Sequence, residues 1–214
     1  MESIIPAIRQ KNLCPLLLFI LKTSNHLLKT IKLYKMSEQS SLFIKVKISK
    51  ENLNSFLSSR PVASILNSNW LEWWDSRLMY SKTELKNIPS FNSESNKQIL
   101  EDLLVDKYSI CKQEYNQDQG VWYFMSLQYS ENYTEILPML SWIKDLANYT
   151  DENDIGDAFI YDFLWGEGTV MAYIHIQNKQ ASLNRFDKTV QINTELLQEA
   201  NQMFEDFMNS FEKD

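Results

Sequence analysis

Apolar and polar residues alternate in the segment that begins at residue 41. Every second position from 42 to 48 carries a large aliphatic side chain, namely Leu42, Ile44, Val46 and Ile48. Lys45 and Lys47 lie between them. Because successive side chains of a strand point to opposite faces of a sheet, this period of two predicts a strand over 41–48 with one buried face.

Five later segments also have the composition and spacing of strands. They are 107–115, 120–129, 157–165, 169–176 and 181–188. The polar stretch 116–120 separates the first two, and Gly166-Glu167-Gly168 separates the next two. Connections this short favour hairpins of antiparallel strands.

Apolar residues spaced three and four positions apart predict five helices. Four of them cover 51–58, 65–80, 133–147 and 194–211. The fifth begins after Ser95, because Gln98 follows three residues later and completes a capping-box signal. Pro138 is expected in the first turn of its helix, where a missing N–H is tolerated. The last helix carries Phe204 and Phe207 in the middle of its apolar stripe, and we expect both to be buried against the sheet.

The order of these elements predicts an α+β fold. Hairpins dominate, and strands and helices do not alternate regularly along the chain. We therefore expect a largely antiparallel sheet of about six strands, covered by helices on one face. Residues 36–214 are enough for a single domain with a substantial core.

The first 35 residues differ from the rest in charge. They hold six basic residues and one acidic residue, a net charge of +5, whereas the whole chain carries −7. Residues 36–214 therefore carry −12. Three explanations are open: a start codon assigned upstream of Met36, which we favour, a signal peptide, and a basic amphipathic surface anchor. The apolar run 13–21 is shorter than the roughly 20 residues a bilayer needs, so we expect no stable membrane insertion and place 1–35 outside the fold.

The negative charge of 36–214 restricts the kinds of partner. An acidic surface repels nucleic-acid phosphates and suits a basic protein, so we expect no nucleic acid. Cys14 and Cys111 are far apart and match no metal or redox spacing. Cysteines that need no disulfide are typical of a reducing cytosol, so we expect a cytoplasmic protein.

The sequence contains no motif for catalysis or for a nucleotide cofactor. Gly166-Glu167-Gly168 is the nearest to a phosphate loop, but it lies between two strands, whereas phosphate loops precede a helix. Cys111 and His175 could form a nucleophile–base pair if their strands were adjacent, although a lone cysteine in a strand is usually a small buried hydrophobe. We expect no catalytic residue, no metal and no cofactor.

The segment 145–168 has seven acidic residues and no lysine or arginine. A calcium loop counted from Asp151 fails at Ile155, where an oxygen ligand is required. Paired carboxylates for hydrolysis, a docking patch for a basic partner and a solvated loop remain as alternatives. For the docking patch, the candidate residues are Asp151, Glu152, Asp154 and Asp157.

Three tryptophans, Trp70, Trp73 and Trp74, lie close together in the predicted helix 65–80. Neighbouring helical residues point about 100° apart, so all three cannot face one direction. Tryptophan is enriched at binding hot spots, which makes Trp74 a candidate anchor for a partner. The alternative is a broad apolar face that buries all three.

Acidic, aromatic-rich α+β chains without catalytic residues resemble bacterial toxin-immunity proteins. The resemblance is one of general character over 36–214, and it implies a non-catalytic domain that masks the site of a basic protein toxin. The alternative is a small-ligand-binding or enzymatic domain with an aromatic-lined pocket. The residues expected to line that pocket are Trp122, Tyr123, Tyr161 and Tyr173.

Overall fold

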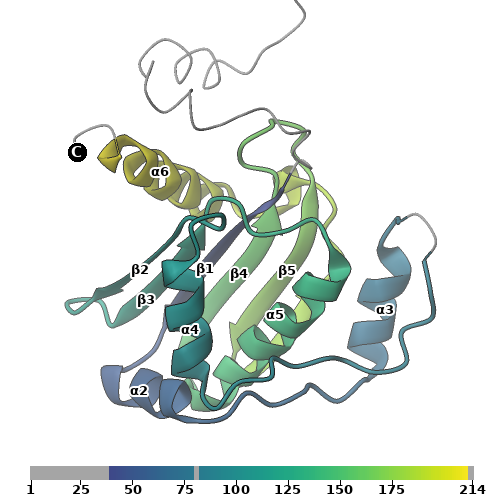
Figure 1. The fold of residues 1–214 in the computed structure, drawn as a ribbon, viewed down its shortest axis with the longest axis horizontal. Coiled ribbons are helices and arrows are strands. Elements are labelled where there is room, and N and C mark those ends of the chain that lie inside the picture. The colour runs from purple at the N-terminus through teal and green to yellow at the C-terminus, as the bar shows by residue number, and fades with distance from the viewer. Residues whose placement is uncertain (1–38, 80–81, 212–214) are drawn as a thin grey trace, which may run out of the picture. The chain divides into compact units, whose positions relative to one another are not determined.

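The computed structural model describes residues 39–79 and 82–211, which contain one six-stranded sheet (Figure 1). The strands are β1 (Ser41–Lys47), β2 (Cys111–Asn116), β3 (Val121–Ser126), β4 (Ile155–Tyr161), β5 (Val170–Gln177) and β6 (Gln180–Asn184). Their order across the sheet is β2-β3-β1-β4-β5-β6, and every pair of neighbours is antiparallel. The predicted single α+β domain with a largely antiparallel sheet of about six strands is confirmed.

Helices cover both faces of this sheet. The described residues form α2 (Lys50–Ser58), α3 (Ser68–Ser76), α4 (Asn96–Val105), α5 (Tyr133–Leu146) and α6 (Thr194–Ser210), with two short 3-10 turns, η2 (Ala147–Tyr149) and η3 (Thr189–Gln191). The larger core lies between one face and α2 to α5, and Figure 1 views the sheet from the side of α4 and α5. A second core lies between α6 and the opposite face, called here the α6 face.

The prediction that helices cover only one face is wrong, and the central strands explain why. In β1, Leu42, Phe43 and Ile44 are consecutive and all fully buried. All six residues of β3 are buried as well. A strand that is apolar at successive positions needs cover on both faces. The alternation around Lys45 and Lys47 describes only the end of β1 and conceals this requirement.

The helix boundaries follow their caps. The Ser95 prediction is confirmed, since its Oγ accepts the Gln98 N–H at 3.2 Å. α3 is shorter than predicted because Asn67 caps it by accepting the Trp70 N–H at 3.2 Å. Pro138 lies in the second turn of α5, contrary to prediction, because Asn132 starts the helix at Tyr133.

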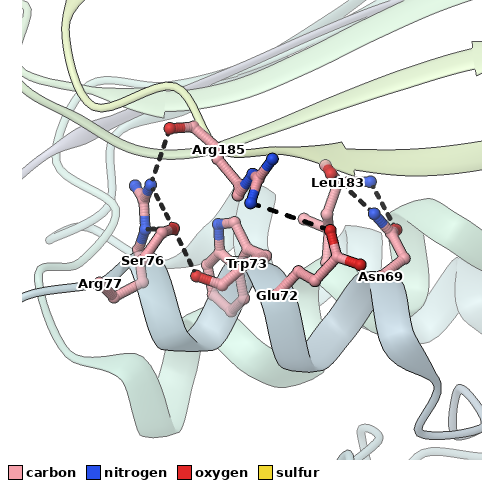
Figure 2. Close-up of polar contacts among 7 residues, drawn as sticks. All are labelled: Asn69, Glu72, Trp73, Ser76, Arg77, Leu183 and Arg185. Atoms are coloured by element: carbon pink, nitrogen blue, oxygen red, sulfur yellow. Dashed lines mark hydrogen bonds and ion pairs between the residues drawn. The ribbon is translucent and has the colours of Figure 1, made fainter.

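Side chains from α3 and α5 close the outer edge of β6, and Figure 2 shows the contacts made from α3. The amide of Asn69 pairs with the backbone of Leu183 as a neighbouring strand would: Nδ2 donates to the carbonyl and Oδ1 accepts the N–H, both at 2.8 Å. Lys144 of α5 donates to the carbonyl of Ala181. Occupied edge groups are not available to pair with a strand from another chain.

Lys144 is expected to make the stability of the fold depend on pH. Burial lowers the pKa of its ammonium to about 8, whereas an unfolded lysine keeps a pKa of about 10.4. Between these values the unfolded chain holds a proton that the folded chain has lost, so the contribution of Lys144 to the free energy of unfolding rises as the pH increases. We expect Lys144→Met to remove this rise in denaturant titrations at pH 7.5 and 10.

Lys107→Met is the matched control, because Lys107 is exposed and should leave the pH dependence unchanged. If both variants show the same pH dependence as the unaltered chain, Lys144 keeps its proton in the fold and the expectation is wrong.

Candidate functional site

A row of polar side chains crosses all six strands on the α6 face. Each member lies directly opposite the next in the strand register. From β2 to β6, this polar row consists of Glu114, Tyr123, Lys45, Asp157, His175 and Ser182. Directly opposite residues of antiparallel strands have Cβ atoms about 5 Å apart, so the members can interact side by side.

The middle of the polar row forms the floor of a groove of about 570 Å³. The groove arises because α6 packs on aromatic side chains, including Phe43 and Phe159, while its first two turns extend beyond them over the polar row. Its lining residues are Lys45, Lys47, Val121, Ile155, Gly156, Asp157, Tyr173, His175, Asn193, Glu195, Leu196 and Glu199.

Asp157 is fixed on the groove floor by two neighbours on β5. The hydroxyl of Tyr173 donates to its Oδ1 at 2.6 Å, and Nδ1 of His175 lies 2.8 Å from the same oxygen. Burial, and then the bond to Asp157, raise the pKa of the Tyr173 hydroxyl, so it remains a donor at physiological pH. Because His175 uses Nδ1 for this contact, Nε2 is the ring nitrogen left for a ligand.

Glu199 of α6 is held in a similar way above β1 and β3. Its Oε1 accepts the hydroxyl of Tyr123 at 2.9 Å, and its Oε2 lies 2.6 Å from Nζ of Lys45. Burial, and then Glu199 itself, raise the pKa of Tyr123. The groove therefore contains two carboxylates, Asp157 and Glu199, that are each oriented by a tyrosine hydroxyl before any ligand arrives.

The four predicted acidic residues occupy different environments. Asp157 lines the groove, whereas Asp154 is 7 % exposed and its Oδ2 accepts the Asp151 N–H at 2.9 Å, closing the turn before β4. Asp154 also lies 3.9 Å from Lys47 of β1, so this segment, which contains no lysine or arginine of its own, has a counter-charge from a neighbouring strand. Asp151 and Glu152 are exposed. Lys47 lines the groove and lies near Asp154, so the loop that contains Asp154 adjoins the groove.

Trp74 belongs to the core. It is 6 % exposed, its Nε1 donates to the Thr83 carbonyl at 2.9 Å, and its ring meets Tyr133 edge-on. Trp70 and Trp73 are fully buried beside it. The three tryptophans thus follow the alternative of a broad buried face, packed between α3, α5 and the sheet.

Two other interpretations of the sequence fail on topology. Cys111 and His175 lie on β2 and β5, which three strands separate, so they are roughly 19 Å apart at about 4.8 Å per strand. Burial also raises the pKa of the Cys111 thiol to about 11. The calcium-loop interpretation fails because β4 begins at Ile155, so most of the second half of the proposed loop is strand.

The predicted aromatic pocket is not assembled. Trp122 packs in the core on the opposite face from Tyr123 and Tyr173. Tyr161 is 1 % exposed and donates to Asn201 at 2.7 Å. Of these four aromatic residues, Tyr173 alone lines the groove among the described residues.

Within 39–79 and 82–211, no group of three or more His, Cys, Asp and Glu side chains is arranged to hold a metal ion. No helix in the same ranges is both long and apolar enough to cross a membrane. Comparisons with protein families, with curated proteins and with solved structures find no match to this chain.

Proposed function

We propose that this chain is a non-catalytic binding domain that neutralises a basic protein by masking its site, as toxin-immunity proteins do. The groove is the site that receives a lysine or arginine side chain of the partner. One observation carries this proposal: Asp157 and Glu199 are held in place by tyrosine hydroxyls in a concave site. Carboxylates that are already ordered lose little conformational entropy when a cation binds.

The charges around the groove favour a cation over an anion. Its two lysines are offset, since Lys45 pairs with Glu199 and Lys47 lies 3.9 Å from Asp154. Asp157 and the exposed Glu195 are left as negative groups facing the groove. A guanidinium or ammonium group of a partner complements these two remaining negative charges.

The surface around the groove is also negatively charged. α6 contains four acidic residues and no lysine or arginine over 194–210. The exposed residues Asp151 and Glu152 precede β4 at the end of the sheet that holds the groove. Negative charge spread over a surface accelerates the encounter with a basic partner and makes the rate depend on salt. Trp74 has no part in this surface, because it is buried.

The lining of the groove supports binding over covalent catalysis. No serine, threonine or cysteine is among its described lining residues, so His175 has no aliphatic hydroxyl or thiol there to activate. The hydroxyl of Tyr173, which does line the groove, already donates to Asp157.

A small cationic ligand is the second candidate. A groove of about 570 Å³ falls within the range of small-molecule sites. The two candidates differ in what remains with the purified chain: a stoichiometric protein for the first, a small molecule for the second.

Neutralising the two held carboxylates is the test. The full chain and the double variant Asp157→Asn/Glu199→Gln are each immobilised and exposed to lysate of the native cell. The amides keep the shape and still accept the tyrosine hydroxyls, but they lose both negative charges. We expect one stoichiometric basic protein on the unaltered chain and at least about tenfold weaker retention on the variant.

Glu205→Gln/Asp206→Asn is the matched control, because it removes the same charge from exposed positions of α6 outside the groove. The control should retain the partner. Retention by all three proteins would contradict the role of the groove. If mass spectrometry of the native chain shows a bound small molecule and no protein, the immunity proposal gives way to the ligand candidate.

A further inference from the structure

The two edges of the sheet differ in how their backbone groups are used. At β6, the outward groups of Ala181, Leu183 and Arg185 bond to side chains, as Figure 2 shows for the last two. At β2, no residue within 39–79 and 82–211 bonds to the outward backbone. Figure 1 shows β2 at the opposite side of the sheet from β5. Among the residues that the structure describes, one edge is therefore closed and the other is open to a further strand.

The register determines which groups of β2 point outward. The Ile48 N–H donates to the Gly120 carbonyl at 2.9 Å, so the even-numbered residues of β3 bond to β1. Its odd-numbered residues then bond to β2, where they lie opposite Lys112, Glu114 and Asn116. The Leu127 N–H donates to the carbonyl of residue 110 at 3.2 Å, which continues this pairing of odd-numbered with even-numbered residues.

It follows that three residues of β2 present their N–H and C=O groups to the outside, namely Cys111, Gln113 and Tyr115. Gln113, the middle one, is exposed. A strand laid antiparallel against these groups would make about six backbone hydrogen bonds.

We propose that the occupant of this edge is a second copy of the chain, paired antiparallel about Gln113 so that the two sheets become continuous. In this arrangement Gln113 lies opposite Gln113 of the second copy. Cys111 lies opposite Tyr115 of the second copy. The outward N–H and C=O groups of all three residues then form hydrogen bonds with the second copy. The pairing is isologous, as the common two-fold dimers are.

The charges of β2 select this register. With Gln113 opposite itself, Lys112 lies opposite Glu114 of the second copy, and the symmetry forms this ion pair twice. Both side chains are on the α6 face, and they already approach within 3.5 Å in one chain. A shift to either neighbouring register that keeps the hydrogen bonds puts Lys112 opposite Lys112, or Glu114 opposite Glu114. Opposite charges across strands stabilise pairing and like charges oppose it.

Charge reversal tests the register. The mass of the full chain is measured by light scattering and sedimentation over a range of concentrations, with twice 25.3 kDa expected for the unaltered protein. Lys112→Glu and Glu114→Lys each convert both cross-strand pairs to like charge, so we expect each to weaken the dimer by at least about tenfold. The double variant Lys112→Glu/Glu114→Lys restores opposite charges and should restore the dimer.

A backbone substitution tests the edge itself. Gln113→Pro removes an outward N–H and leaves the β2–β3 hydrogen bonds in place, since proline is tolerated on edge strands. We expect a monomer that remains folded by circular dichroism. Gln113→Ala is the control, because both variants lose the bond between the Gln113 side chain and Trp122, but alanine keeps the N–H and should keep the dimer.

Three results would overturn the proposal. The first is a monomer at every concentration of the unaltered chain. The second is a dimer that persists in Gln113→Pro. The third is a double charge reversal that dissociates as readily as the single ones. None of these measurements depends on the groove or on a basic partner.

Discussion

Replacement of Arg77 with alanine is expected to destabilise the fold by about 4 kcal/mol, because it leaves one buried and three partly buried carbonyls without this donor. Arg77 is 4 % exposed. Its Nη1 lies 2.9–3.2 Å from the carbonyls of Val170, Met171 and Phe186, and its Nη2 donates to the Arg185 carbonyl at 3.2 Å. These carbonyls belong to the start of β5 and to the segment after β6, so one side chain ties α3 to both.

The guanidinium is suited to this position. Its donors are fixed in a planar fork and can serve several acceptors, whereas a lysine ammonium provides only three donors at one atom. Burial lowers the pKa of Arg77, with Tyr133 and Asp187 acting in the opposite direction. Arg77→Lys is therefore expected to recover only part of the lost stability.

Denaturant titration followed by tryptophan fluorescence measures the effect. Arg185→Ala is the matched control shown beside it in Figure 2: its side chain is exposed and lies 4.0 Å from Glu72. Exposed pairs of this kind contribute little, so the control should lose no more than about 0.5 kcal/mol. If Arg77→Ala loses equally little, water replaces the guanidinium at the carbonyls and the proposed tie does not exist.

The helix α3 shows which parts of the fold the sequence could predict. The spacing of Trp70, Trp73 and Trp74 predicted a helix, and a broad buried face was one of two interpretations of it, beside Trp74 as an anchor for a partner. The same spacing continued to Arg77 and Leu78, but the helix ends at Ser76 and Leu78 is 97 % exposed. The arginine leaves the helix to reach carbonyls more than 90 positions further along the chain, and periodicity contains no information about such contacts.

The polar row shows the same limit for the site. Lys45, Asp157 and His175 lie in segments that were each predicted as strands. Asp157 and His175 are neighbours through the hairpin of β4 and β5, but Lys45 joins them only because β1 inserts between β3 and β4, a pairing of strands more than 70 residues apart. Hairpin signals predict pairing between consecutive strands, and they do not predict where an isolated first strand will lie. Asp157 was identified through its acidic neighbours, whereas Glu199 gave no signal among the other acids of α6.

The position of α6 depends on a small aromatic core. Phe204 is fully buried, as predicted, and stacks on Phe163 with ring centroids 4.9 Å apart. It also meets Phe43 and Tyr161, at 6.3 and 6.2 Å. Phe207, which is 8 % exposed, continues this contact along the helix and is also buried as predicted. Since the start of α6 forms one wall of the groove, this packing also positions Glu199.

Phe204→Ala is accordingly expected to cost about 3–5 kcal/mol in the free energy of unfolding, the range for removing a fully buried phenylalanine. The substitution leaves a cavity between α6 and the sheet, and the surrounding rings can fill only part of it. Denaturant titration gives the loss. Phe211→Ala is the matched control, because Phe211 is 46 % exposed after the end of α6 and should cost less than about 1 kcal/mol. A loss below about 1 kcal/mol for Phe204→Ala would contradict the tight packing of α6 on the sheet. The wall of the groove would then be loosely held, and Asp157 and Glu199 could not act as a pair fixed in advance.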